Sequence, residues 1–293
     1  RAKINIQSVG YDQSNTMQFL EGKQLIGQIL SDFPTKGALC FKKMKFSVIL
    51  DIGCGSGDLT RLIAQLIPHD IIIGIDNDTN MVTFSENNNP TPETISYVCQ
   101  DISQPWYQLA PELTRLAGQV DLILSNMTLQ WVTDIETVCK NFEYLLKPWG
   151  AFYLSVMGIK PISISREEQF LKRQKSIAVQ MTEIEEILNR DELVVGRSEL
   201  CHNRCQYSAE EFEAMAPIMY KMYENLINQD EFSKLDKIGQ DAVRQEIRNG
   251  VLAQYGFDVE NEGENYVFGS GKRAWFCYDV FTIEGGKTVG GRS

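Results

Sequence analysis

The sequence predicts an α/β fold in which a doubly wound, mainly parallel sheet is covered by helices on both faces. Apolar runs without polar alternation recur between residues 46 and 158, and segments with helical spacing separate them. Strands that are apolar throughout are typical of a parallel sheet buried on both faces. In addition, a glycine-rich segment, DIGCGSG at residues 51–57, overlaps the end of the first run. Glycine loops at this position hold a nucleotide in many doubly wound folds.

The expected elements alternate along the first half of the chain. Residues 1–45 form a mostly polar lead-in with helical spacing of apolar residues, which predicts an N-terminal helical cap. An α/β core is expected over residues 46–158. Its strands are predicted at 46–53, 71–76, 95–101, 120–126 and 150–158, and its helices at 58–67, 81–88 and 135–146.

The pattern changes after the fifth strand. Residues 159–256 carry few strand signals and predict a mainly helical, substrate-binding insertion. Residues 257–285 hold two apolar runs around a Gly-Ser-Gly turn and predict a terminal β-hairpin that completes the sheet. Residues 286–293 predict a flexible tail. One helical stripe is either plain core or the wall of an apolar pocket: Phe212, Met215, Met219, Met222, Tyr223 and Leu226.

Composition limits the class of partner. The 293 residues carry 28 basic and 39 acidic side chains, a formal net charge of −11, which disfavours nucleic acid and anionic membrane surfaces. Neither a stretch of about 18 apolar residues nor a signal-peptide pattern occurs, so we expect a cytoplasmic protein without membrane insertion. The cysteine count, seven in a long chain, predicts reduced thiols rather than a disulfide scaffold. A homodimer is compatible with the sequence.

No metal centre is expected. Cys201, His202 and Cys205 offer two thiols and an imidazole within five residues. The spacing is unusual for zinc, and a fourth ligand is not obvious.

The glycine loop favours a nucleotide that carries an amino acid. Gly53, Gly55 and Gly57 follow G-x-G-x-G spacing, whereas a dinucleotide motif has its third glycine one position later. Asp51 stands before the loop, where a carboxylate opposes a pyrophosphate but accepts from an amine. The loop therefore suits a zwitterionic amino-acid portion and a sulfonium, and disfavours the alternative of an NAD-dependent oxidoreductase. Cys54, inside the loop, is expected to pack rather than react.

Polar side chains also end the later strands. Asp76 ends the second strand, where a carboxylate can take both ribose hydroxyls, and Asp101 ends the third, where it can accept from an adenine amino group. Ser125 and Asn126 end the fourth strand, at the same ligand-binding edge of the sheet. The residues expected to contact the cofactor are Asp51, Gly53, Cys54, Gly55, Asp76, Asn77, Met81, Asp101, Ile102, Ser125 and Asn126.

These features together resemble the class I S-adenosylmethionine-dependent methyltransferases. The match covers roughly residues 46–157 and rests on D-I-G-C-G-S-G, Asp76, Asp101 and LLKPWGAFYL. Where the family commonly has L-K-P-G-G, Trp149 replaces a glycine. The resemblance implies that S-adenosyl-L-methionine is the cofactor and that its methyl group is transferred.

Two further segments indicate the acceptor. SNMTLQWV places Trp131 just after the fourth strand, where the indole N–H is a donor suited to an anion. YDQSNTMQ places Tyr11, Asn15 and Gln18 on one helical face. The two segments resemble those of insect juvenile hormone acid (farnesoic acid) O-methyltransferases, which implies that Gln18 and Trp131 hold the substrate carboxylate as catalytic residues. The alternatives are a core aromatic residue for Trp131 and a solvated helix residue for Gln18.

The expected reaction is esterification of a carboxylic acid, and the expected substrate is a small, apolar molecule. An ionised carboxylate needs no general base, and His69 and His202 lie away from the strand ends. The SN…QW stretch also resembles bacterial malonyl-carrier-protein and trans-aconitate methyltransferases, which esterify carboxylates as well. A protein that binds the cofactor without transferring methyl is a further alternative.

Overall fold

The structure is a computed structural model that describes residues 16–33, 45–165, 167–172, 174–254 and 273–289. The described residues form one seven-stranded sheet in the order β3-β2-β1-β4-β5-β7-β6. β1 to β5 are parallel, and β7 is antiparallel to both of its neighbours, so the predicted doubly wound, mainly parallel sheet is confirmed. The strands are β1 (Phe46–Ile52), β2 (His69–Asp76), β3 (Ile95–Cys99), β4 (Val120–Asn126), β5 (Leu146–Gly158), β6 (Leu193–Ser208) and β7 (Arg273–Lys287).

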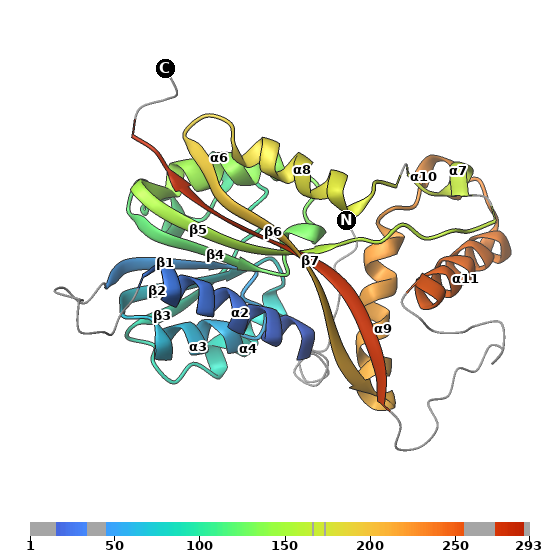
Figure 1. The fold of residues 1–293 in the computed structure, drawn as a ribbon, viewed down its shortest axis with the longest axis horizontal. Coiled ribbons are helices and arrows are strands. Elements are labelled where there is room, and N and C mark those ends of the chain that lie inside the picture. Colours follow the sequence, from blue (N-terminus) through green and yellow to red (C-terminus); the bar gives the residue numbers. More distant parts are fainter. Residues whose placement is uncertain (1–15, 34–44, 166, 173, 255–272, 290–293) are drawn as a thin grey trace.

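Helices cover both faces of this sheet (Figure 1). On one face, α2 (Thr16–Asp32), α3 (Asp58–Leu66) and α4 (Thr79–Asn87) cover an apolar layer that includes Ile49, Ile72 and Leu124. On the other, α5 (Pro111–Thr114), α6 (Ile135–Leu145) and α8 (Ile177–Leu188) cover a layer that includes Leu50, Ile123 and Leu154. Successive residues of a strand point to opposite faces of the sheet. Because helices cover both faces, the strands need apolar residues at consecutive positions.

The turns at the carboxyl ends of the strands start the next helices. Asp78 accepts a hydrogen bond from the backbone N–H of Asn80 at 2.8 Å and caps α4. Asp134 accepts from the backbone N–H of Thr137 at 3.0 Å and caps α6, after the short helix η2 (Leu129–Trp131). Such caps satisfy the free N–H groups of a first helical turn. They fix where each strand-to-helix loop ends.

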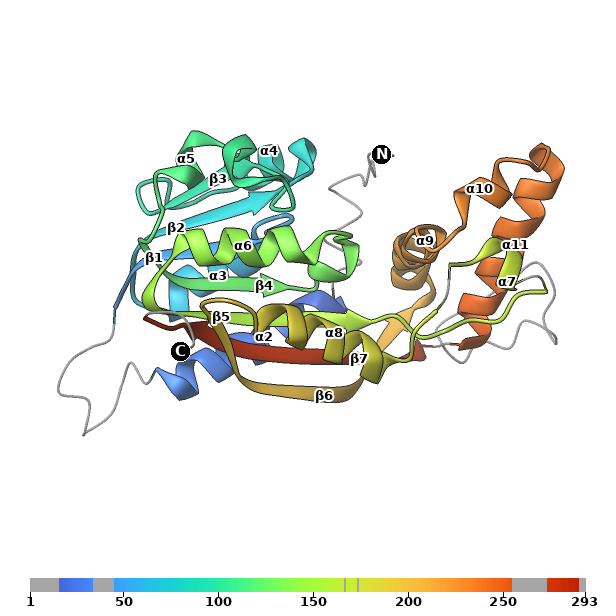
Figure 2. The same ribbon diagram turned by 90° about the horizontal axis from the view of Figure 1, so that it is seen from above.

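A group of helices lies beyond the carboxyl edge of the parallel strands (Figure 2). It contains α7 (Glu167–Phe170), α9 (Ala209–Glu224), α10 (Gln229–Phe232) and α11 (Lys237–Gln254). Ser208 and Glu211 form a capping box at the start of α9, with backbone-to-side-chain distances of 3.2 Å and 2.7 Å. None of the helices described is long and apolar enough to cross a bilayer.

The segment 159–256 contains a strand that the sequence did not predict. β6 runs for 16 residues along the outer edge of the sheet, and α8 packs on the core rather than outside it. The apolar alternation of β6 is broken by charged residues and by an irregularity between Val195 and Arg197. An edge strand that is half exposed to solvent tolerates charged residues and such irregularities. The sequence of β6 therefore does not indicate a strand. The predicted division of the chain into a cap, a cofactor-binding core and a substrate-binding insertion stays a prediction.

The predicted C-terminal hairpin stays a prediction. Its first arm and the Gly-Ser-Gly turn lie outside the described residues. The described second arm, β7, lies within the sheet, where residues 279–286 pair with β5 on one side and with β6 on the other. β7 also continues to Lys287, two residues into the expected tail. The pairing of β7 with β6 is one that the sequence did not predict.

Trp149 takes a backbone conformation that favours glycine. Its φ is +65°, in the left-handed region, and it lies within β5, whose register with β4 is irregular between Val120 and Leu122. Trp149 is 77% exposed, so its indole lies on the surface.

Candidate functional site

The glycine loop turns sharply at the end of β1. Gly53, Gly55 and Gly57 have φ values of +74°, +53° and +78°, which side-chain-bearing residues rarely adopt. A Cβ at Gly53 would overlap the Thr128 side chain, and one at Gly57 would overlap Tyr97. The sequence therefore needs glycine here for conformation and for space, and the loop lies at the carboxyl edge of the sheet.

Asp51 is buried beneath this loop. Its side chain is 1% exposed, and Oδ2 accepts a hydrogen bond from the Thr60 hydroxyl at 2.6 Å. Burial raises the pKa of Asp51 to about 6; the Thr60 hydrogen bond opposes this rise, and the charge of Asp76 adds to it. A cationic partner would favour the ionised form of Asp51, so this carboxyl suits a ligand that brings an amine.

The two other predicted carboxylates hold the backbone of neighbouring loops. Asp76 accepts from the N–H of Gly55 at 3.0 Å and from the N–H of Asp78 at 2.9 Å. Burial raises the pKa of Asp76, although these hydrogen bonds lower it. Asp101 accepts from Ser103 N–H at 2.9 Å, from the Ser103 hydroxyl at 2.6 Å and from Gln104 Nε2 at 3.2 Å. The roles of Asp76 and Asp101 toward ribose and adenine stay predictions.

A pocket of about 380 Å³, its mouth included, opens between the glycine loop and α2. Five residues predicted from the sequence line it, four from the cofactor set and one from the acceptor pair: Asp51, Gly53, Cys54, Asn126 and Gln18. The structure therefore brings the N-terminal helix and the glycine loop to one site.

Two residues that line this pocket carry a buried acceptor oxygen. Within the described part of the chain, Gln18 Oε1 and Asn126 Oδ1 have no hydrogen-bond partner. Asn126 uses its Nδ2 to donate to the Gln18 carbonyl at 2.9 Å, which joins β4 to α2. Which amide atom is oxygen follows from the hydrogen-bond network. Together with the carboxyl of Asp51, these acceptors fit a ligand with an ammonium group, such as the amino-acid portion of S-adenosylmethionine.

The remaining predicted cofactor residues are dispersed around this pocket. Ser125 is buried and donates to the Ile52 carbonyl at 3.1 Å, so it ties β4 to β1. Met81 and Ile102 are buried, and Asn77 is exposed at the end of β2. Burial is the main cause that raises the pKa of the Cys54 thiol well above its usual range. The raised pKa disfavours the reactive thiolate.

Sequence reasoning missed several residues of the site. Phe19, Ser56, Asp58 and Leu59 also line the pocket. Ser85 on α4 is buried and donates to the Gly55 carbonyl at 2.8 Å. The signal for Ser56, Asp58 and Leu59 was their place beside the loop. Phe19 and Ser85 carry no such signal, because only the packing of α2 and α4 brings them close.

The structure places Gln18 and Trp131 in different surroundings. Gln18 lines the glycine-loop pocket, whereas Trp131 packs, half-buried, against an apolar cluster to which α9, α11 and β7 contribute. Met17, next to Gln18, belongs to the same cluster. The other members of the predicted helical face, Tyr11 and Asn15, lie outside the described residues. A joint grip on a carboxylate stays a prediction.

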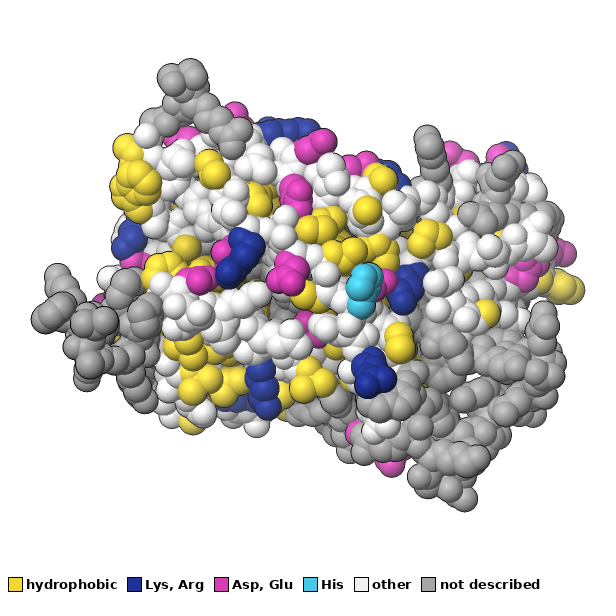
Figure 3. Space-filling view, viewed as in Figure 1, with side chains coloured by type: hydrophobic (Ala, Val, Ile, Leu, Met, Phe, Trp, Pro, Cys, Tyr) yellow, Lys and Arg dark blue, Asp and Glu magenta, His cyan; other side chains and the backbone are white. Residues whose placement is uncertain are grey.

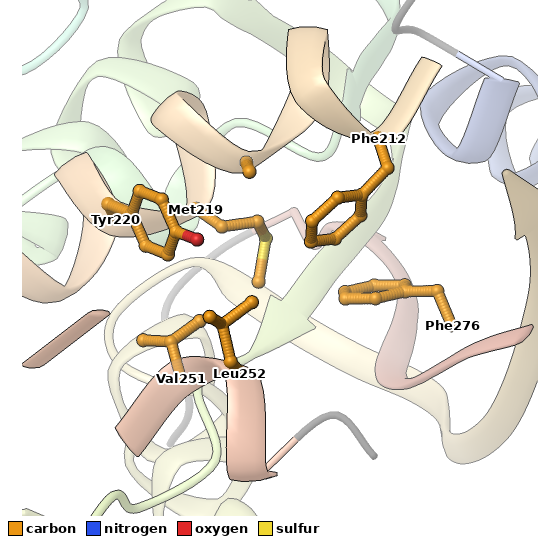
Figure 4. Close-up of a pocket in the computed structure, with 7 residues that line it drawn as sticks. Phe212, Met219, Tyr220, Val251, Leu252 and Phe276 are labelled. Atoms are coloured by element: carbon orange, nitrogen blue, oxygen red, sulfur yellow. The ribbon is translucent and has the colours of Figure 1, made fainter. Parts of the chain in front are cut away.

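An apolar cavity of about 190 Å³ lies within that cluster (Figure 4). Side chains from α9, α11 and β7 converge on it; the cavity is lined by Phe212, Ala216, Met219, Tyr220, Val251, Leu252 and Phe276. The predicted stripe of α9 is therefore divided. Phe212 and Met219 wall the cavity, while Met215, Met222 and Tyr223 are buried core.

Both histidines lie away from the pocket. His69 begins β2, at the amino end of the strand, and its ring Nδ1 lies 2.8 Å from the Ile67 carbonyl oxygen. His202 lies on β6 and pairs with Asp279 of β7. On the face shown in Figure 3, acidic and basic side chains of the described residues are interspersed with apolar ones. The pocket therefore offers carboxylates, amides and a backbone cradle, without an imidazole in its described lining.

The comparisons with known proteins agree with this geometry. Residues 50–154 match the family model of the methyltransferase domain. The malonyl-[acyl-carrier protein] O-methyltransferase of Priestia megaterium is 28% identical over 158 residues, which cover 54% of this chain and 51% of that protein. The protein of the same name from Bacillus cereus is 23% identical over 220 residues, covering 72% and 75%. The chain thus spans about half the length of the first of these relatives.

A solved structure shares the fold over nearly the whole chain. The phosphoethanolamine N-methyltransferase 2 of Haemonchus contortus, in complex with phosphomonomethylethanolamine and S-adenosylhomocysteine, has a TM-score of 0.52 at 15% identity. The alignment covers 98% of this chain and 58% of that one. At this level of identity the likeness concerns the fold alone.

Proposed function

We propose that this chain, whose residues 50–154 match the family model of the methyltransferase domain, is a class I S-adenosylmethionine-dependent methyltransferase that esterifies the carboxylate of an organic acid. S-adenosylmethionine supplies an electrophilic methyl group on a cationic sulfonium. The observation that carries the proposal is the pocket between the glycine loop and α2, whose described lining has acceptors for an ammonium group and no imidazole. An acceptor that is already ionised needs no proton removed.

Asp51 and the loop backbone are proposed to hold the amino-acid portion of the cofactor. Asp51 is buried and borders the pocket, and Gly53 brings the backbone to its wall. Asp76, which already orders Gly55, is proposed to take the ribose, and Asp101 the adenine. The protein's contribution to rate is then orientation of two reactants and exclusion of water.

Gln18 and Trp131 are proposed to aim the acceptor carboxylate. Gln18 lies at the cofactor pocket and Trp131 against the apolar cluster, so a carboxylate between them would lie next to both pockets. Their amide and indole N–H groups are neutral donors, suited to an anion. In this arrangement neither side chain transfers a proton, so the pH–rate profile is expected to be flat near neutrality.

Relatives favour a small or carrier-bound acid as the acceptor. The two relatives above are named malonyl-[acyl-carrier protein] O-methyltransferases, and the reaction proposed here is of that type. A second candidate acceptor is an apolar acid such as farnesoic or juvenile hormone acid. It is favoured by the apolar lining of the cavity that lies within the cluster against which Trp131 packs.

The test is a transfer assay with methyl-labelled cofactor. The acceptors are malonyl-loaded carrier protein, trans-aconitate, farnesoic acid and dodecanoic acid, with phosphoethanolamine and a catechol as amine and phenol controls. We expect alkali-labile methyl ester from at least one acid and no product from the controls. Transfer to an amine or phenol alone would contradict the proposal, as would cofactor binding without transfer to any acid.

The same assay tests the acceptor grip. Trp131→Phe keeps an aromatic ring and removes the donor, and Gln18→Leu keeps the approximate bulk. Loss of one hydrogen bond to a charged group costs about 1.5–3 kcal/mol, or about 10- to 150-fold in kcat/KM. Full activity of Trp131→Phe, or a steep rise of rate between about pH 6 and 8, would show that a base takes part.

A further inference from the structure

A buried carboxyl joins the roof of the cofactor pocket to the strands that carry the apolar cavity. Glu21 lies on α2, one turn beyond Gln18, and is 1% exposed. Its Oε1 accepts from the Tyr278 hydroxyl at 2.7 Å and from Asn203 Nδ2 at 2.9 Å. Tyr278 and Asn203 are partners in the register of β7 and β6. One oxygen atom thus binds both strands at the same rung.

This rung lies where β6 and β7 leave the rest of the sheet. The pairing of β5 with β7 ends at Gly158 and Asp279, so residues 273–278 pair with β6 alone within the described sheet. Figure 1 shows this two-stranded ribbon projecting past the sheet toward α9. Glu21 therefore fastens α2 at the base of the ribbon.

The ribbon leads from Glu21 to the cavity. The Tyr278 ring stacks on Phe276, with centroids 5.7 Å apart and an interplanar angle of 26°. Phe276 lines the apolar cavity (Figure 4). In the other direction, Gln18 and Phe19 on the same helix line the cofactor pocket. A continuous series of contacts thus connects the two pockets through Glu21.

Stability gives little reason for a carboxyl at this place. Both side chains that donate to Glu21 are neutral, and burial, opposed by those two hydrogen bonds, raises its pKa. Removing a carboxylate from water costs several kcal/mol, and well-packed apolar residues often replace such groups without loss of stability. A hydrogen-bonded carboxyl instead fixes distance and direction between α2 and the ribbon.

We propose that Glu21, through Tyr278 and Asn203, is a positioning residue that couples the two pockets. Occupation of the apolar cavity orders Phe276 and Tyr278, which holds α2 in place over the cofactor pocket and tightens cofactor binding. The coupling is reciprocal, so the cofactor tightens binding of the apolar ligand by the same factor. This inference rests on the proposed function only in assigning the glycine-loop pocket to the cofactor.

The structure offers a matched control on the same helix. Tyr153 of β5 donates to Asp32 at the other end of α2, with an O···O distance of 2.8 Å. Tyr278→Phe and Tyr153→Phe therefore each remove one tyrosine hydroxyl from one α2 carboxylate. Only the first lies on the route between the pockets. Glu21→Gln keeps an acceptor oxygen at the rung and removes the charge.

The experiment measures the affinity for S-adenosylhomocysteine by calorimetry, with and without saturating dodecanoate. In the parent protein we expect dodecanoate to tighten binding by about 5- to 20-fold, within the usual range for coupled sites. In Tyr278→Phe and Glu21→Gln the factor should fall below about twofold, and in Tyr153→Phe it should stay at the parental value. Thermal unfolding checks that each variant is folded.

Three results would overturn the inference: no coupling in the parent, parental coupling in Tyr278→Phe, or an equal loss in Tyr153→Phe. A residue that only stabilises the fold would lower the unfolding temperature and leave the coupling factor unchanged. No methyl transfer is needed, so a failed acceptor screen leaves this test intact. Hydrogen exchange of residues 17–21, slowed by dodecanoate in the parent but not in Tyr278→Phe, tests the coupling without the cofactor.

Discussion

The two hollows at the carboxyl edge of this sheet are built by different means. The glycine-loop pocket is lined mainly by the consecutive segment 51–59, with two residues of α2 and Asn126 completing it. The apolar cavity is lined by α9, α11 and β7, between 212 and 276 in the chain. The first is polar and carries φ angles that only glycine tolerates well. The second is formed by side chains that many apolar residues could replace.

This difference separates what is fixed from what is free to vary. A backbone cradle fails when one Cβ is added, so its sequence is narrowly constrained. An apolar wall tolerates volume-conserving exchange, so the same fold can accept acids of different shape. We therefore expect substitutions in the glycine loop to abolish cofactor binding, and substitutions in the cavity to change acceptor preference while leaving cofactor affinity without an apolar ligand near the parental value.

The largest effect is expected from Gly53→Ala. The variant carries left-handed strain of about 1–2 kcal/mol, and its Cβ overlaps the Thr128 side chain. Cofactor affinity measured by calorimetry should fall by at least about 100-fold. Gly118→Ala is the matched control, because Gly118 has φ +66° but open space around its Cβ position. If Gly53→Ala bound the cofactor with the parental affinity, the glycine-loop pocket would be no more constrained in sequence than the apolar cavity.

Asp51 should make the stability of the cofactor-free protein depend on pH. Its folded-state pKa of about 6 lies above the unfolded value near 4, so the native state binds more protons between these values. The resulting stabilisation is complete below about pH 4 and is lost as pH rises through 6, a change of about 3 kcal/mol. In Asp51→Asn, chemical denaturation should show this part of the pH dependence abolished. Asp70 is an exposed carboxylate of β2, and in Asp70→Asn the unfolding free energy should depend on pH as it does in the parent. If Asp51→Asn also showed the pH dependence of the parent, the raised pKa of Asp51 would be refuted.

A smaller loss is expected from Asp76→Asn. The amide keeps one acceptor oxygen but loses the charge that strengthens the bonds to Gly55 and Asp78. We expect cofactor affinity to fall by about 10- to 50-fold, since hydrogen bonds to charged groups contribute about 1.5–3 kcal/mol. Asp78→Asn should stay within about twofold, because Asn caps a helix as well as Asp does. If the two variants had the same cofactor affinity, Asp76 would have no specific role in binding the cofactor.

The smallest effect on the cofactor, and a selective one on the acceptor, is expected from Ala216→Phe. A ring at position 216 projects into the cavity of about 190 Å³. KM for apolar acids should rise by about 10-fold, while KM for short acids and cofactor affinity stay within about twofold. Val179→Phe, at an exposed site on α8, controls for the added ring. Unchanged KM for every acid would mean that the cavity lies outside the acceptor path.

The core was predictable because its signals are local. β1, β4 and β5 each contain a run of consecutive apolar residues, and the buried faces that such runs require can be seen in the sequence itself. The glycine loop and Asp76 follow directly from residue type and position. β6 was not predictable in this way, because an edge strand with one wet face carries charges such as Arg197 and Arg204.

The sequence by itself determined the parallel sheet, the glycine loop and the carboxylates at the strand ends, because each depends on short-range periodicity or on the special geometry of glycine. Only the tertiary structure decided that Gln18 faces the glycine loop while Trp131 packs on the apolar cluster. It also decided that β7 lies between β5 and β6 over residues 279–286, and that Glu21 accepts a hydrogen bond from Tyr278, 257 residues away. Contacts between residues so far apart in sequence depend on the whole packed fold, and no local pattern encodes them.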